Sequence, residues 1–92
     1  MSVAFMLPGP LRPLAQHRAV VRVPARATLA EALAMLWSEC PAVRDRLITE
    51  QGEVRPHVNI FVDGESIRDA DGLATNVRDG AEIFILPAVS GG

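Results

Sequence analysis

The sequence predicts an α+β fold, in which one main helix packs on one face of a single mixed β-sheet. Two apolar segments of strand length, residues 2–7 and 19–23, precede a helical segment at residues 29–39. Two more strand-like segments, residues 57–62 and 81–86, follow it. The element types differ in period, because apolar side chains alternate in a strand and recur every three or four positions in a helix. Strands followed by one helix and then by more strands are typical of an α+β domain.

Composition and length exclude several classes of protein. The 92 residues are 49% hydrophobic, which is typical of one folded domain and not of a disordered chain. The formal net charge is -2 and the chain has no lysine, so we expect no nucleic-acid partner. No segment has the pattern of a signal peptide or the length of a membrane span, so we expect a cytoplasmic protein with no membrane partner. Cys40 is the only cysteine, which excludes an internal disulfide.

The first two strands are predicted to form a hairpin with a long loop. The sides that face the core are expected to carry Val3, Phe5 and Leu7 in the first strand and Ala19, Val21 and Val23 in the second. Val20 and Arg22 point the other way, and Pro24 is expected to end the second strand. The loop between the strands is rich in residues that break regular structure: Pro8, Gly9, Pro10 and Pro13.

The helix at residues 29–39 carries its own start signal. Thr28 and Glu31 fit a capping box, in which the hydroxyl of Thr28 accepts the Glu31 N–H and the Glu31 carboxylate accepts the Thr28 N–H. One apolar stripe then recurs at helical spacing: Leu29, Ala32, Leu33, Leu36 and Trp37. Pro41 prevents a clean continuation, and a short second helical turn is expected at residues 43–48.

The second half of the chain is predicted to complete the sheet. In residues 57–62 the inward side chains are Val58, Ile60 and Val62. Two strong turn dipeptides, Asp63-Gly64 and Asp79-Gly80, separate the later strands, and residues 65–68 are expected to form a short edge strand. A right-handed crossover through the helix places the first and last strands side by side and parallel at the centre of the sheet.

A short segment follows the last strand directly. Pro87 is expected to stop the strand, and the sequence closes with Gly91 and Gly92. Glycine has no Cβ, so its backbone fits a channel that is too narrow for other residues. From the end of the strand such a segment reaches roughly 20 Å, at about 3.3 Å per extended residue. We therefore predict a domain of residues 1–87 and a flexible tail of residues 88–92.

This arrangement points to the α-carboxylate of Gly92 as the functional group. Condensation with ATP converts a carboxylate into an acyl-adenylate, from which AMP leaves readily, and a sulfur nucleophile then gives a thiocarboxylate. No side chain hinders attack at a glycine carbonyl. The residues alone leave a second interpretation equally open, since a terminus of small residues is in most chains simply frayed.

Residues 79–92, DGAEIFILPAVSGG, resemble the C-terminus of the MoaD/ThiS family of ubiquitin-like sulfur carriers. That family ends in Asp-Gly-Asp/Glu, an apolar strand, proline, a small residue, valine, a small residue and Gly-Gly. Residues 58–65, VNIFVDGE, and 72–75, GLAT, resemble the CysO branch, as does the inserted loop at residues 49–56. The resemblance is specific over residues 57–92 and implies a β-grasp fold, a ubiquitin-like mixed sheet with one main helix packed on one face.

The resemblance also implies a function and a set of partners. A partner adenylates and thiocarboxylates Gly92, and the tail residues Val89, Ser90 and Gly91 thread the partner's channel. The chain binds no cofactor and is a protein co-substrate, not an enzyme, because ATP is used by an adenylating enzyme of the MoeB/ThiF type. A sulfurtransferase or a sulfide source supplies the sulfur. In the CysO branch the acceptor is a cysteine synthase, and a metalloprotease later frees the new cysteine.

Three alternatives stay open for the end use of the tail. The first is the small subunit of molybdopterin synthase or a carrier for another thio-metabolite. The second is a ubiquitin-like protein modifier joined through Gly92 to a target lysine, and the third is a non-covalent interaction module. The absence of lysine forbids lysine-linked chains of the protein with itself, although it allows single attachment to a target.

Two surfaces are candidates for contact with a partner. Phe61, Phe84 and Leu86 form an apolar patch if they face outward, but Ile83 and Ile85 compete with the last two for the core. A negative surface near the tail is expected to steer docking to a basic partner, unless its charges are only solvated turns: Asp63, Glu65, Asp69, Asp71, Asp79 and Glu82.

The remaining reactive or polarisable side chains are expected to be structural. Cys40 has no histidine near it in sequence and is expected to be a small buried or half-buried thiol. His17 and His57 lack the spacing of metal ligands, so no metal site is predicted. Met35 and Trp37 stand at helical spacing and are expected to pack rather than bind a ligand.

Overall fold

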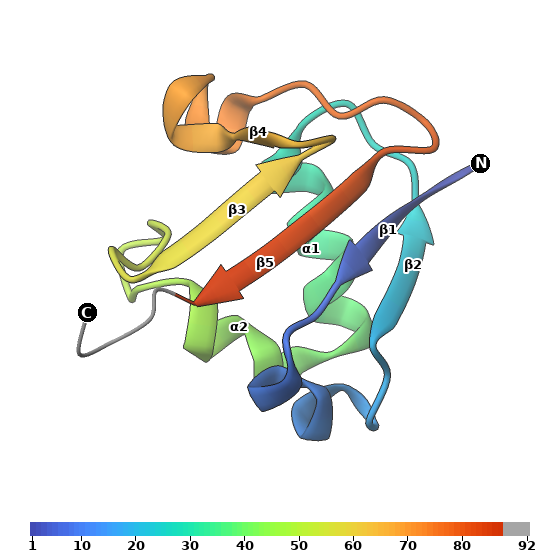
Figure 1. The fold of residues 1–92 in the computed structure, drawn as a ribbon, viewed down its shortest axis with the longest axis vertical. Coiled ribbons are helices and arrows are strands. Elements are labelled where there is room, and N and C mark those ends of the chain that lie inside the picture. Colours follow the sequence, from blue (N-terminus) through green and yellow to red (C-terminus); the bar gives the residue numbers. More distant parts are fainter. Residues whose placement is uncertain (88–92) are drawn as a thin grey trace.

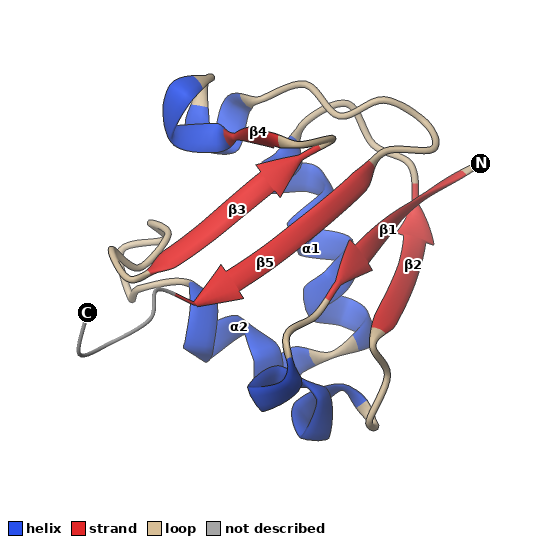
Figure 2. Cartoon of the chain, viewed as in Figure 1, coloured by secondary structure: helices blue, strands red, loops and turns tan. Residues whose placement is uncertain are grey.

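The computed structural model describes residues 1–87 as a five-stranded sheet with helices on one face (Figure 1). The strands are β1 (Ser2–Met6), β2 (Val20–Pro24), β3 (Val58–Val62), β4 (Glu65–Ser66) and β5 (Glu82–Pro87). The helices are α1 (Leu29–Glu39) and α2 (Pro41–Leu47), with 3₁₀ turns η1 (Gly9–Ala15), η2 (Ile67–Asp69) and η3 (Gly72–Ala74). In Figure 2, α1 lies behind the sheet, and no helix of residues 1–87 crosses the face of the sheet that is turned to the viewer.

The last strand lies at the centre of the sheet. The strand order is β2-β1-β5-β3-β4, with β5 parallel to β1 and antiparallel to β3. Because β1 and β2 form a hairpin and the chain returns through α1 and α2, the first and last strands become neighbours in the middle of the sheet. The predictions of an α+β fold and of a parallel central pair are both confirmed.

Both helices begin at residues that suit a first turn. Thr28 Oγ1 accepts the N–H of Glu31 at 3.3 Å, and the Thr28 N–H donates to Glu31 Oε1 at 3.1 Å, so the capping box is confirmed. Helix α2 begins at Pro41, two residues earlier than predicted, because a missing N–H is tolerated in the first turn. None of the described residues forms a helix that is long and apolar enough to cross a membrane.

Alternate side chains of β5 face the core. Ile83 and Ile85 are fully buried, whereas Phe84 is 39% exposed and Leu86 is 44% exposed. The buried face of α1 completes this core: Leu29, Ala32, Leu33 and Leu36. Ile83 and Ile85, and not Phe84 and Leu86, therefore face the core, because only that side of β5 packs against α1.

One prediction about strand β2 was wrong, because Ala19 is exposed and lies outside the strand. Pro24 ends β2, as predicted, and is its last paired residue, opposite Ser2. A proline is tolerated there because β2 is an edge strand and has no neighbour that needs the missing N–H.

Two connections contain more structure than the sequence indicated. The proline-rich loop after β1 forms the turn η1, which buries Leu11 and Ala15 against the core. The edge strand expected at residues 65–68 is only the two residues of β4. It stops because the Ser66 hydroxyl accepts the Arg68 N–H at 3.3 Å and starts the turn η2.

Replacing Ile85 by alanine is expected to lower the free energy of unfolding by about 2–5 kcal/mol, because the smaller side chain leaves a cavity in the core. Leu86→Ala is the matched control, since it removes the same type of side chain from the exposed side of the same strand. It is expected to change the free energy of unfolding by less than about 1 kcal/mol. Urea denaturation followed by circular dichroism measures both, and equal losses would contradict the burial pattern of β5.

Candidate functional site

The C-terminal end of β5 is where the chain leaves the sheet, and we call it the exit end. On one side β5 stays paired with β3 to its last residue, Pro87, opposite Val58. On the other side its pairing with β1 stops at Phe84, opposite Met6. The residues predicted to act in the tail come after this point and lie outside the described residues: Val89, Ser90, Gly91 and Gly92.

Five apolar side chains share the uncovered face of the sheet, between the middle of β5 and its exit end. Residues paired in register point to the same face, which puts one residue from each of β2, β1, β5 and β3 in a row: Val20, Met6, Phe84 and Phe61. Leu86 lies further along β5 on the same face and is exposed, while Met6 and Phe61 are half-buried. We call these five residues the exit patch.

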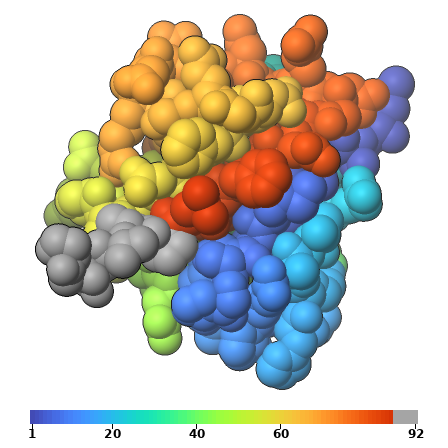
Figure 3. All heavy atoms as spheres, viewed as in Figure 1, coloured from blue at the N-terminus to red at the C-terminus, as the bar shows by residue number. Residues whose placement is uncertain are grey.

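A hollow opens beside the exit patch because β1 leaves the sheet before β5 does. It has a volume of about 330 Å³ and lies between the segment after β1, which includes Pro8 and Arg12, and the outer side of β5 at Phe84 and Leu86. Figure 3 shows β5 as a red band on this face, between the N-terminal strands and β3. Exposed apolar side chains beside a hollow form a surface that suits an apolar side chain of another protein.

Four of the six acidic residues predicted to lie near the tail are at the other end of β5. Asp63 accepts the N–H of Glu82 at 2.9 Å and Asp79 accepts that of Ser2 at 2.9 Å, which fixes both carboxylates where β5 and β1 begin. β5 is 6 residues long, so its two ends lie about 16 Å apart at about 3.3 Å per residue. Glu82 is the first residue of β5, and Glu65 is paired with Val62 beside it. For these four acids the predicted negative surface near the tail was wrong; Asp69 and Asp71 follow in η2 and in the segment after it.

The start of β3, which borders the exit end, is held by the side chain of Arg68. Its Nη1 donates to Asn59 Oδ1 at 2.8 Å. Its Nη2 donates to the carbonyl oxygens of Arg55 at 3.3 Å and Pro56 at 3.2 Å. One guanidinium therefore joins the turn η2 to the loop that enters β3. The role of Arg68 is to position the strand against which the end of β5 is paired.

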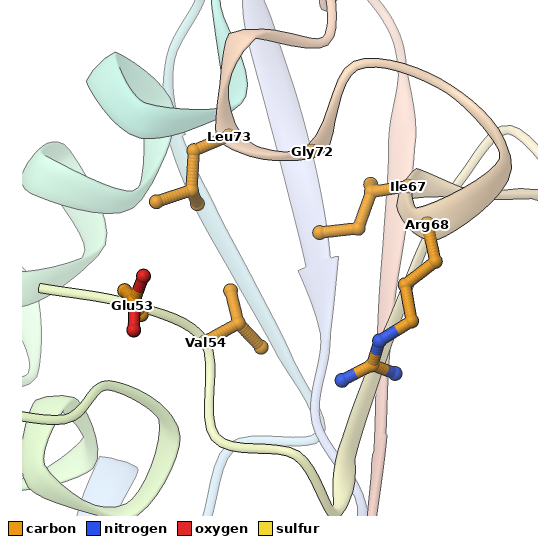
Figure 4. Close-up of a pocket in the computed structure, with 6 residues that line it drawn as sticks. All are labelled: Glu53, Val54, Ile67, Arg68, Gly72 and Leu73. Carbon is orange, nitrogen blue, oxygen red and sulfur yellow. The ribbon is translucent and has the colours of Figure 1, made fainter.

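A second hollow lies beside Arg68 and is separate from the exit patch (Figure 4). Its volume is about 290 Å³, and its apolar wall is formed by Val54, Ile67 and Leu73, with Glu53 on its rim. The Arg68 guanidinium at its edge already has the three partners described above. No residue of the exit patch lines this hollow, so the structure does not connect it to the exit end.

The cysteine and the histidines do not form a reactive site with one another. Cys40 is buried, as predicted. Its Sγ lies 3.3 Å from Nη2 of Arg18, whose Nη1 forms an ion pair with Glu39 at 3.1 Å. Within residues 1–87, no group of three or more His, Cys, Asp or Glu side chains is placed to hold a metal ion.

Comparison with known proteins agrees with the geometry of the exit end. A profile of the ThiS family matches residues 5–92, which includes all of β5 and the segment after it. The chain belongs to the ThiS family. Small proteins of this kind are carriers and are not themselves enzymes. The ThiS-family protein described here therefore has the ubiquitin-like β-grasp fold that the resemblance implied.

Individual relatives of this ThiS-family protein cover nearly the same length. Sulfur carrier protein CysO from Mycobacterium tuberculosis is 34% identical over 94 residues, 100% of this chain and 100% of CysO. Small archaeal modifier protein 3 from Haloferax volcanii is 41% identical over 71 residues, 77% of this chain and 76% of the relative. One chain in the crystal structure of the Amycolatopsis orientalis BexX/CysO complex matches 98% of this chain over 99% of its own length, with a TM-score of 0.89 and 31% identity.

Sequence analysis named three residues of the exit patch and missed two. Phe84 and Leu86 are exposed and Phe61 is half-buried, so none of the three belongs to the fully buried core. Met6 and Val20 were missed. Their direction follows from alternation within each strand, but their position beside Phe84 depends on the pairing of β1 with β5, which no local pattern encodes. Whether a partner binds this patch stays a prediction.

Arg68→Met, which keeps the length of the side chain and removes the guanidinium, is expected to loosen the loop that enters β3. Loss of charge-assisted hydrogen bonds worth about 1–2 kcal/mol predicts roughly tenfold faster amide hydrogen exchange at residues 55–59. Arg78→Met, at an exposed arginine elsewhere in the fold, is the control and is expected to leave those rates unchanged. Unchanged exchange in the Arg68 variant would show that Arg68 does not hold β3.

Proposed function

We propose that this ThiS-family protein is a sulfur carrier, in which the Gly92 carboxylate is adenylated and converted to a thiocarboxylate that donates sulfur in biosynthesis. The observation that carries the proposal is the position of β5 at the centre of the sheet, where the strand that leads to Gly-Gly is paired with β1 as far as Phe84 and with β3 as far as Pro87. When a partner binds residues that follow a well-anchored strand, the rest of the protein loses little conformational entropy.

The proposed chemistry has two steps. A Gly92 carboxylate oxygen attacks the α-phosphorus of ATP, pyrophosphate leaves, and an acyl-adenylate forms. Hydrosulfide then attacks the carbonyl carbon, and AMP departs with the electron pair of the broken C–O bond, which leaves a thiocarboxylate. No atom changes its oxidation state overall. The residues beyond Pro87 span at most about 17 Å at about 3.3 Å each, so a partner must bind close to the exit end for Gly92 to reach its active site.

We propose the partners that this chemistry requires. An adenylating enzyme of the MoeB/ThiF type uses ATP, so the chain is its protein co-substrate and binds no cofactor of its own. A sulfide source or a sulfurtransferase supplies the sulfur, and a cysteine synthase accepts it, after which a metalloprotease frees the cysteine. The 34% identity to CysO over its whole length supports this acceptor, and we assign the pathway to the cytoplasm. The crystal structure of the BexX/CysO complex supports a complex with a partner protein.

A second function shares the first step. In a protein modifier, the amine of a target lysine takes the place of hydrosulfide and forms an amide with Gly92. The 41% identity to small archaeal modifier protein 3 favours this alternative. The absence of lysine in the chain restricts such a modifier to targets other than the side chains of its own copies.

Intact mass spectrometry tests the role of Gly92. After incubation with ATP, magnesium, an adenylating enzyme of the MoeB/ThiF type and sodium sulfide, the protein is expected to gain about 16 Da, the replacement of one oxygen by sulfur. Deletion of Gly92 is expected to abolish this gain and to leave thermal unfolding unchanged. Glu50→Gln, in an exposed loop, is expected to load like the wild type. Loading of the truncated chain would overturn the assignment, and lysine adducts without the thiocarboxylate would favour the modifier.

Leu86→Asp tests the exit patch as the docking surface of the adenylating enzyme. A charge at the centre of an apolar contact is expected to raise the KM for the carrier at least about tenfold, a loss of about 1.4 kcal/mol of binding. Leu86 is exposed, so the fold is expected to be retained. Ala74→Asp places the same charge on an exposed residue of η3, outside the patch, and is expected to leave KM unchanged. Equal KM values for both variants would exclude the exit patch from the interface.

A further inference from the structure

We infer that a basic collar surrounds the exit end and docks on carboxylates that border the mouth of a partner's channel. The collar consists of Arg12, Arg46 and His57. The inference rests on the proposed function, because it assumes a partner that receives the tail. It also reverses the expectation from sequence order, which placed acidic residues on the carrier and basic residues on the partner.

Two hollows flank the exit end, one on each face of the sheet. The hollow on the uncovered face is lined by Arg12 together with Phe84 and Leu86. The other, of about 150 Å³, is lined by Arg46, His57 and Val58, and Val58 is paired with the last residue of β5. Pro8 lines both hollows, so the two meet at the point where the chain leaves the sheet.

The three collar residues come from three different elements. Arg12 lies in η1, Arg46 in α2, and His57 directly before β3, and all three are exposed. Arg12 Nε donates to the carbonyl oxygen of Leu7 at 3.1 Å, which holds this side chain beside the end of β1. Because the elements approach from different directions, their nitrogen donors surround the exit end instead of forming a stripe along one helix.

The two hollows at the exit end are lined by basic, neutral polar and apolar side chains. Among the described residues that line the two hollows, none is Asp or Glu. Asp45, the acid next to Arg46 in α2, has its side chain 87% exposed and lies 3.7 Å from Arg44. Asp63 and Asp79 are fixed at the opposite end of β5 by their bonds to backbone N–H groups. The hollows at the exit end are therefore basic, whereas the carboxylates of Asp63 and Asp79 lie at the opposite end of β5.

The charge of the collar and the apolar exit patch beside it indicate which kind of partner surface binds here. Guanidinium groups pair with carboxylates in bidentate geometry, and separated charges orient a partner during its approach. The exit patch beside the collar is apolar and the chain as a whole has a net charge of -2, which disfavours a phosphate backbone as the occupant. The surface that fits is a protein with an apolar shelf and a rim of Asp and Glu side chains around a narrow channel.

Paired charge removals test the collar in the sulfide-loading reaction described above. Arg12→Gln with Arg46→Gln is compared with Arg22→Gln and Arg78→Gln, which removes the same charge from exposed residues away from the exit end. The collar pair is expected to raise KM for the carrier about tenfold at low salt while kcat changes less than about twofold. The control pair is expected to stay within about twofold of wild type, and the difference is expected to shrink between about 50 and 500 mM NaCl.

The outcomes separate the collar from the proposed function. Arg12→Lys with Arg46→Lys, which keeps both charges, is expected to restore most of the lost affinity, and circular dichroism melts check that each variant folds. If the wild type loads and the collar pair loads with an unchanged KM, the collar inference is overturned while the carrier function stands. Equal increases in both pairs attribute the effect to net charge and also overturn it. If the wild type does not load at all, the proposed function is overturned, and so is the collar inference that rests on it.

Discussion

The pairing of β5 between β1 and β3 is the interaction on which the rest of the structure depends. Backbone pairing with β1 and β3 holds this strand at the centre of the sheet. One of its faces packs against the core, and the other is exposed. Ile83 and Ile85 fill the core against α1, and Phe84 and Leu86 form part of the exit patch. One strand therefore supplies core packing, an exposed apolar surface and a fixed starting point for the residues that follow it.

Unequal strand lengths create the features of the exit end. β3 remains paired with β5 to Pro87, while β1 ends at Met6 and turns into η1. The space that β1 vacates is the hollow beside the exit patch, and η1 brings Arg12 to its edge. Arg68 holds the entry of β3 on the other side. These packed elements thus surround the C-terminal end of β5.

Positions along the sequence led to a wrong prediction of which charged residues lie near the C-terminal end of β5. Asp79 and Glu82 are close to the tail in sequence, yet an extended strand carries the chain about 16 Å away from them before it leaves the sheet. Arg12, Arg46 and His57 are far from β5 in sequence and line the two hollows beside its C-terminal end. The net charge of -2 averages over both ends and describes neither of them.

Local interactions explain what the sequence by itself determined. The period of the apolar residues, the Thr28–Glu31 capping box and the Asp-Gly turns act over a few residues, so they predicted the α+β order and the bounds of α1. The right-handed crossover rule then predicted the central parallel pair of strands. The terminal motif also indicated the family. Only the tertiary structure decided which side of β5 is exposed, that Met6 and Val20 join Phe84, and which charges surround the exit end. Those features depend on register between segments that meet only when the hydrophobic core assembles, and no short-range pattern carries that register.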